Sequence, residues 1–159
     1  MGRIDFSTSL QQLDGEDWGE SMGPTRLVME CHRLRRVPID QLTGDNLRML
    51  ISQRIGLEYL VPRALELLTD DPLLEEDYRL YPGDLLWVLL VRPHAFWTEH
   101  DEWRDKLRSI AVAARARCDE INAQAEADWH KMPSVVPEVV EAIDRFLAKC
   151  GSNRDRAVD

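Results

Sequence analysis

Four histidines and a run of acidic side chains are the residues of this sequence that could do chemistry. His94 and His100 stand six residues apart in "HAFWTEH", a spacing that does not bring two metal ligands onto one face of a helix. The run "TDDPLLEED" at 69–77 could offer carboxylate oxygens to a divalent cation, but it lacks the spacing of an EF-hand loop. The sequence also lacks a Walker loop and the G-x-S-x-G and G-x-G-x-x-G motifs. It therefore predicts no catalytic centre, no metal site and no cofactor.

The distribution of charge favours protein binding over nucleic-acid binding. The formal net charge is −9, and residues 57–84 carry eight acidic against two basic side chains. A negative surface repels phosphate backbones, so direct binding of nucleic acid is not expected. Because opposite charges steer association, the expected partner is a basic protein. A solvated surface without a partner is the alternative interpretation of this acidic cluster, which comprises Asp70, Asp71, Glu75, Glu76 and Asp77.

The five tryptophans are numerous for a chain of 159 residues. Most are expected in the core, because they lie on apolar faces of predicted helices. Trp18 differs, since it follows "LDGED" in a polar, glycine-containing segment. An exposed tryptophan can anchor a protein interface, so Trp18 is a candidate contact residue.

Cysteine usage and the N-terminus indicate a cytoplasmic protein. Cys31, Cys118 and Cys150 are odd in number and form no C-x-x-C pair, which suits buried thiols in a reducing compartment. The N-terminal "MGRIDFSTSL" lacks the apolar core of a signal peptide. No apolar run approaches the ~20 residues that cross a bilayer, so no membrane contact is expected.

Helical periodicity and capping residues predict the elements that position these side chains. A first helix is expected over 25–36, with Leu27, Val28, Cys31 and Leu34 facing inward. A second helix should begin at Thr43 and end at Gly56, which suits the left-handed residue after a helix. A third should start with Pro62 in its first turn and run to residue 68, because a proline inside a helix costs about 3 kcal/mol.

The second half of the chain also has a helical pattern. Asp71 is expected to cap a helix, and "YPGD" predicts a turn. "DLLWVLLV" could be a buried strand, but its leucines and the preceding cap Asp84 favour a core helix. Residues 98–130 predict one long helix, and the last helix should run from Pro137 to a stop at Gly151. The long helix carries an apolar stripe of Trp103, Leu107, Ile110, Ala114, Cys118, Ile121, Ala125 and Trp129.

These elements predict an all-α protein, a compact single-domain bundle of five to seven helices with one long helix in the C-terminal half. The expected organisation is an irregular acidic segment at 1–24, the helical domain at 25–150 and a loose tail at 151–159. The apolar stripe could serve a dimer seam as well as a bundle. A monomer is nevertheless favoured.

Several segments together are similar to one known family, the immunity proteins of contact-dependent growth inhibition (CDI) systems of bacteria. They are "LDGEDWGE", "CHRLRRVPIDQLTGDNLRMLISQRIGLEYLVPRALELL", "PLLEEDYRLYPGDLLWVLL" and "FW". The similarity extends over roughly residues 10–97, well over half of the chain. The sequence departs from the family pattern at Ser52, Arg63 and Glu76, and "RL" at 79–80 resembles an insertion.

The resemblance implies a cytoplasmic protein that binds and neutralises the toxin domain at the C-terminus of a large secreted CDI protein. Many such toxins are nucleases with basic clefts, which an acidic inhibitor would complement. Toxin contacts are expected at the acidic cluster and Trp18, and no catalytic residues are implied. The shared motif residues are expected to form caps, turns and buried hydrogen bonds; they are Arg48, Gln53, Gly56, Tyr59, Pro62, Tyr81, Pro82, Gly83 and Asp84. A stand-alone acidic adaptor or regulator that binds another basic protein remains the alternative, and gene context would distinguish the two.

Overall fold

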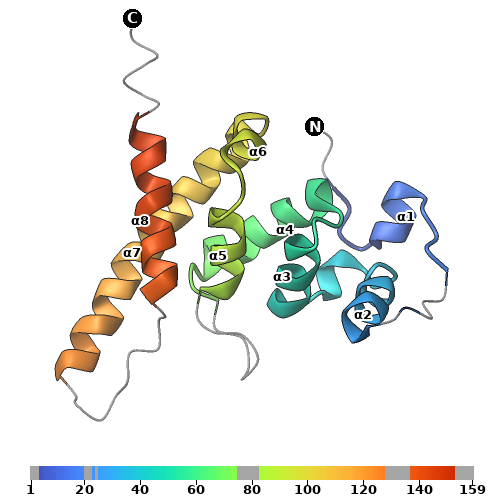
Figure 1. Cartoon of the computed structure of the whole chain (residues 1–159), viewed down its shortest axis with the longest axis horizontal. Coiled ribbons are helices and arrows are strands. Elements are labelled where there is room, and N and C mark those ends of the chain that lie inside the picture. Colours follow the sequence, from blue (N-terminus) through green and yellow to red (C-terminus); the bar gives the residue numbers. More distant parts are fainter. Residues whose placement is uncertain (1–3, 20–22, 24, 75–82, 128–136, 153–159) are drawn as a thin grey trace, which may run out of the picture.

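The computed structural model describes residues 4–19, 23, 25–74, 83–127 and 137–152. These residues form eight α-helices, one 3-10 helix and no strand (Figure 1), so the predicted all-α class is confirmed. The number of helices exceeds the expected five to seven because two five-residue helices were not predicted. They are α1 (Leu10–Asp14) and α6 (His94–Thr98). Helix α1 lies in the segment predicted to be irregular, and a capping box between Ser9 and Gln12 stabilises its start.

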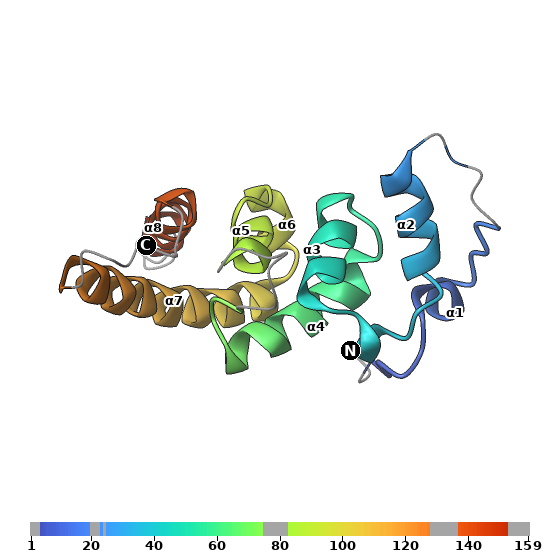
Figure 2. The same ribbon diagram turned by 90° about the horizontal axis from the view of Figure 1, so that it is seen from below.

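The helices form two layers. One layer is a row of four helices, each in contact with the next: α2 (Arg26–Leu34), α3 (Gly44–Ser52), α5 (Asp84–Leu90) and α8 (Pro137–Ser152). The other layer holds α4 (Leu57–Asp70) and the long α7 (Asp101–Ala127), which pack against each other beneath this row (Figure 2). The 3-10 helix η1 (Ile39–Gln41) packs on α4.

The corner between α3 and α4 differs from its prediction. Gly56 does not end α3; it is the N-cap of α4, with φ 59°. Helix α4 starts at Leu57 and continues through Pro62, so the predicted restart at the proline was wrong. The earlier start brings Leu60 and Val61 into the core, where both are fully buried. Burial of two such side chains contributes about 3–6 kcal/mol, which is enough to offset the cost of about 3 kcal/mol for the internal proline.

Two other predicted helix ends, at Asp84 and Gly151, were wrong by one residue, whereas the cap predicted at Asp71 is confirmed. Asp84 is the first residue of α5, and Gly83, with φ 87°, is its N-cap. Asp71 is the C-cap of α4: its backbone N–H donates to the Leu67 carbonyl at 3.0 Å, and its carboxylate accepts the Leu73 N–H at 3.2 Å. Gly151 lies within α8 instead of ending it. Asp84 and Gly151 thus have residue types that suit a terminus, but each lies one position from the observed one.

The core is formed largely by the predicted apolar faces. On α7, the stripe residues Leu107, Ile110, Ala114 and Cys118 are buried, while Trp129 lies outside the described residues. Helix α2 is the exception, because Cys31 and Leu34 are buried but Leu27 and Val28 are 42% and 37% exposed. Burial raises the pKa of the Cys31 and Cys118 thiols, which keeps them protonated at neutral pH. Among the helices that the structure describes, none is long and apolar enough to cross a membrane.

Candidate functional site

The described part of the acidic cluster lies at the C-terminal end of α4. Asp70 is the last residue of α4 and Asp71 the next, and both side chains are exposed. The carbonyl groups at this end carry the negative end of the helix dipole. The two carboxylates add to that field, so the end of α4 concentrates negative potential. Glu75, Glu76 and Asp77 lie outside the described residues.

Trp18 lies at the opposite end of α4. It lines a cavity of about 550 Å³ together with Gly56, Leu57 and Glu58, where α4 begins. Helix α4 has 14 residues, so its two ends are about 20 Å apart along the axis. The two predicted contact sites are therefore separate surfaces. A single protein partner of standard size could still cover both if they share a face.

Trp18 is held in place by a buried arginine. Arg35 is only 3% exposed, and its Nη2 donates to both carboxylate oxygens of Asp14, at 2.9 and 2.8 Å, and to the carbonyl of Glu16 at 3.0 Å. The Arg35 guanidinium lies over the Trp18 ring, 4.0 Å from its centroid, in cation–π geometry. The indole Nε1 of Trp18 donates to the Glu16 carboxylate at 3.2 Å. One part of the ring is thus fixed against Arg35 while 40% of the residue is exposed.

The cavity beside Trp18 combines acidic and aromatic side chains. We call it the α4 groove and define it by Glu16, Trp18, Glu58, Tyr59 and Glu99. Glu16, Glu58 and Glu99 are exposed, whereas Tyr59 is half-buried. Other lining residues include Asp14, Arg35, Arg54, Phe96 and His100. Because Asp14 and Arg35 neutralise each other, the remaining lining charge is negative, which suits a cationic side chain between aromatic rings.

Several motif residues lie at chain corners. A Cβ on Gly56 would come within 2.6 Å of Leu10 Cδ2, and one on Gly83 within 2.7 Å of Val139 Cγ1. Both glycines also have positive φ, so a side chain at either position would be strained as well as crowded. Arg48 Nη2 donates to Asp45 one turn earlier on α3, at 2.7 Å.

The remaining motif residues differ in exposure and in their position within the helices. Gln53 is the exposed C-cap of α3, and Pro62 is half-buried within α4. Asp84 is half-buried at the start of α5. Tyr59 lines the α4 groove, so its surroundings are those of a contact residue as well as a packing residue. Tyr81 and Pro82 lie outside the described residues.

Sequence reasoning missed the residues that build the groove around Trp18. Asp14 and Arg35 are 21 residues apart, and no spacing rule predicts such a pair. Glu58 and Glu99 are also far apart in the sequence, since Glu58 lies in α4 and Glu99 directly follows α6. The one available signal was the presence of Asp14, Trp18 and Arg35 in "LDGEDWGE" and "CHRLRRVP", two segments of the family resemblance. Trp87 was expected in the core but is 39% exposed.

Comparison with known proteins identifies the family. A family model described as CDI immunity proteins matches residues 12–107, which is more than half of the chain and includes every residue that defines the α4 groove. No curated protein matches the chain, and no solved structure does. The match begins within α1 and ends within α7, so it covers both surfaces at the ends of α4. The chain belongs to the family of CDI immunity proteins.

Proposed function

We propose that this protein binds the toxin domain of its own CDI system in the cytoplasm and neutralises it by forming a tight protein–protein complex. The partner is the C-terminal domain of a large secreted CDI protein, and that domain is a nuclease. The immunity protein acts by occupancy and catalyses no reaction. Membership of the CDI immunity family is the observation that carries this proposal.

Electrostatics supports a nuclease as the partner. A nuclease must hold a phosphate backbone and therefore presents a basic cleft. The immunity protein has a formal net charge of −9 and a pI near 4.9. Both of its candidate contact surfaces, the end of α4 and the α4 groove, carry exposed carboxylates. Complementary potentials of this kind raise the association rate and disfavour partners of like charge.

The two surfaces have different proposed roles. The acidic cluster steers the toxin, because the carboxylates of Asp70 and Asp71 are exposed and add to the negative end of the α4 dipole. The α4 groove binds an anchoring lysine or arginine of the toxin, because it has both carboxylates and aromatic rings. Trp18 needs little ordering on binding, since Arg35 and Glu16 already fix its ring.

Growth protection tests the proposed function. Bacteria that express the toxin domain encoded by the preceding gene should stop growing, and co-expression of this chain should restore growth. Co-expression of an immunity protein from an unrelated CDI system is the control and should not restore it. Unrelieved growth arrest with normal amounts of folded protein would contradict the proposal.

Charge reversal at the acidic cluster tests whether these residues raise the association rate locally or only through the net charge of the protein. The steering variant carries Asp70→Lys, Glu75→Lys and Glu76→Lys; it keeps Asp71, whose carboxylate accepts the Leu73 N–H. At low salt we expect the association rate with the toxin domain to fall about 10-fold and to depend less on salt, with little change in the dissociation rate. Stopped-flow kinetics measures both rates.

A matched variant controls for the change in total charge. It reverses three scattered, exposed acids and has the same net charge: Asp40→Lys, Glu102→Lys and Glu138→Lys. Its association rate should stay closer to that of the wild type. Equal slowing in the two variants, or none in either, would show that the acidic cluster has no local role.

A further inference from the structure

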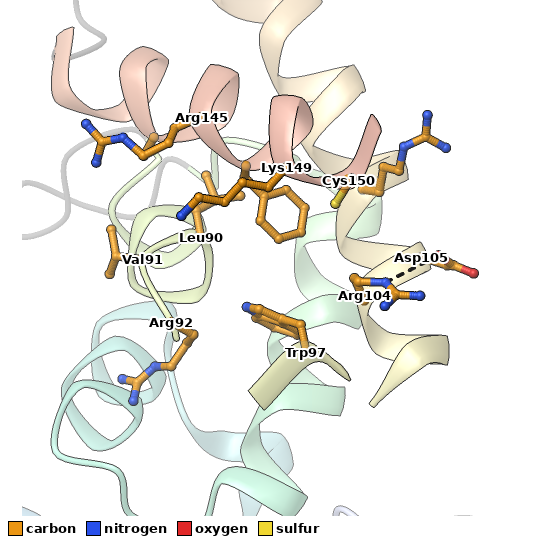
Figure 3. A pocket seen from close by; sticks show the side chains of 12 residues that line it. Leu90, Val91, Arg92, Trp97, Arg104, Asp105, Arg145, Lys149 and Cys150 are labelled. Atoms are coloured by element: carbon orange, nitrogen blue, oxygen red, sulfur yellow. Dashed lines mark ion pairs between the residues drawn. The ribbon is translucent and has the colours of Figure 1, made fainter. Parts of the chain in front are cut away.

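A second cavity has the opposite charge to the rest of the protein. It has a volume of about 250 Å³ and lies where α5, α7 and α8 meet beside Trp97 of α6 (Figure 3). Among the residues that the structure describes, its lining contains a single acidic side chain, Asp105. Five cationic side chains line it: Arg92, Arg104, Arg108, Arg145 and Lys149. Such a concentration of positive charge is unexpected in a chain with a net charge of −9.

Three of these five cations are not neutralised by a carboxylate in the part of the chain that the structure describes. Arg104 pairs with Asp101 at 2.8 Å, and Arg145 pairs with Glu141. Within the described residues, the guanidinium of Arg92 donates only to backbone carbonyls, those of Val88 and Ile51. Burial and the nearby Arg54 lower the pKa of Arg92, as expected for a cation that lacks an anionic partner. Arg108 and Lys149 form no ion pair with any described residue.

The indole of Trp97 is a second, independent observation that points to a ligand site. Its side chain is 2% exposed, and its indole Nε1 has no hydrogen-bond partner among the described atoms. A buried donor without an acceptor is unfavourable and uncommon. Figure 3 shows the indole nitrogen on the edge of the ring that faces the side of the cavity where Arg92 lies. A bound acceptor there would satisfy this N–H.

The size and the apolar lining of the cavity indicate the apolar part of the ligand. Apolar side chains form much of the lining, including Leu90, Trp97, Ala142 and Phe146. An apolar cavity of about 150 Å³ is large enough for benzene. The volume here, about 250 Å³, therefore accommodates an aromatic ring with a charged substituent. It is smaller than the pockets that hold most drug-sized ligands.

We propose that this cavity binds a small organic anion, an aromatic or similarly compact apolar group that carries a carboxylate or phosphate. The anionic group accepts the Trp97 N–H and lies among Arg92, Arg108 and Lys149, while the apolar group packs on Leu90 and Phe146. This site is separate from toxin neutralisation. Several of its lining residues, among them Arg108, Phe146 and Lys149, follow the segment that matches the immunity family.

Nuclear magnetic resonance of the tryptophan indoles can test the site with defined probes. The Trp97 indole N–H resonance is assigned as the signal that Trp97→Phe removes. Titration with phenyl phosphate or phenylacetate should shift this resonance saturably, with a dissociation constant below about 1 mM. Benzyl alcohol, which has the ring but no charge, should bind at least about 10-fold more weakly. The indole N–H resonances of Trp18 and Trp87 should not shift with the same dependence on ligand concentration.

Single substitutions distinguish a specific binding site from a general attraction of anions to positive charge on the protein. Lys149→Ala and Arg108→Ala should each weaken phenyl phosphate binding about 5- to 10-fold, because each removes a cation that no described carboxylate neutralises. Lys106→Ala is the matched control; Lys106 is an exposed α7 lysine outside the lining, and its removal should leave the dissociation constant unchanged. The proposal is overturned if neither anion gives a saturable shift, if benzyl alcohol binds equally well, or if Lys106→Ala weakens binding as much as Lys149→Ala.

Discussion

Arg35→Ala is expected to lower the free energy of unfolding by about 2–4 kcal/mol. The substitution removes two hydrogen bonds to Asp14, one to the Glu16 carbonyl and the contact with the Trp18 ring. Breaking a buried ion pair costs about 3–5 kcal/mol, because the remaining charge is left without compensation. Asp14 keeps 23% side-chain exposure, so water partly restores its solvation and the expected loss is somewhat smaller.

Urea unfolding followed by circular dichroism measures this loss, and Arg33→Ala is its control. Arg33 also pairs with a carboxylate, that of Glu30, but the two side chains are 58% and 33% exposed. Exposed pairs of this kind contribute about 0–1 kcal/mol. The loss for Arg35→Lys should fall between the two, because lysine keeps the charge but loses the planar guanidinium that lies over the Trp18 ring. If Arg35→Ala and Arg33→Ala differ by less than about 0.5 kcal/mol, Arg35 does not hold the Trp18 segment in place.

Trp18→Ala should weaken binding of the toxin domain about 30-fold or more, which corresponds to about 2 kcal/mol. Trp18 is 40% exposed in the free protein, and Arg35 and Glu16 already fix its ring. A partner that covers the ring buries apolar surface at little cost in side-chain entropy. The change should appear mainly in the dissociation rate, as is usual for an anchoring residue.

Trp87 provides a matched control for this substitution. It is exposed to nearly the same extent, 39%, but lies on α5 outside the α4 groove. Trp87→Ala should change the toxin affinity less than about 3-fold. Trp18→Phe should recover part of the affinity, since phenylalanine can still stack on Arg35 although it cannot donate to Glu16. A larger loss with Trp87→Ala than with Trp18→Ala would place the anchor on α5 instead.

Helical periodicity predicted most of the fold because it reports which side chains need burial. The stripe Leu107, Ile110, Ala114 and Cys118 recurs at helical spacing, and all four residues lie in the core. Local rules failed where tertiary packing decided the outcome. Pro62 was placed in a first turn by its local cost, but burial of Leu60 and Val61 extends α4 in front of it.

The candidate site was less predictable than the fold, because it is built from long-range pairs. The exposure of Trp18 followed from its polar surroundings. Its partner Arg35 did not, because the two residues meet only after α1 and α2 are in place. The same holds for Glu58 of α4 and Glu99 after α6, which line the same groove although they are 41 positions apart in the sequence. Leu27 and Val28 illustrate a further limit, since an apolar face does not reveal whether a neighbouring helix is present to cover it.

Calorimetric titration of the purified chain with its toxin domain tests the central claim most directly. The claim is that this acidic, helical protein works by occupying a basic protein. We predict saturable binding with one immunity protein per toxin domain, a dissociation constant of about 10 nM or lower at physiological salt, and weaker binding as salt is raised. No detectable binding at about 10 μM of each folded protein would contradict the account.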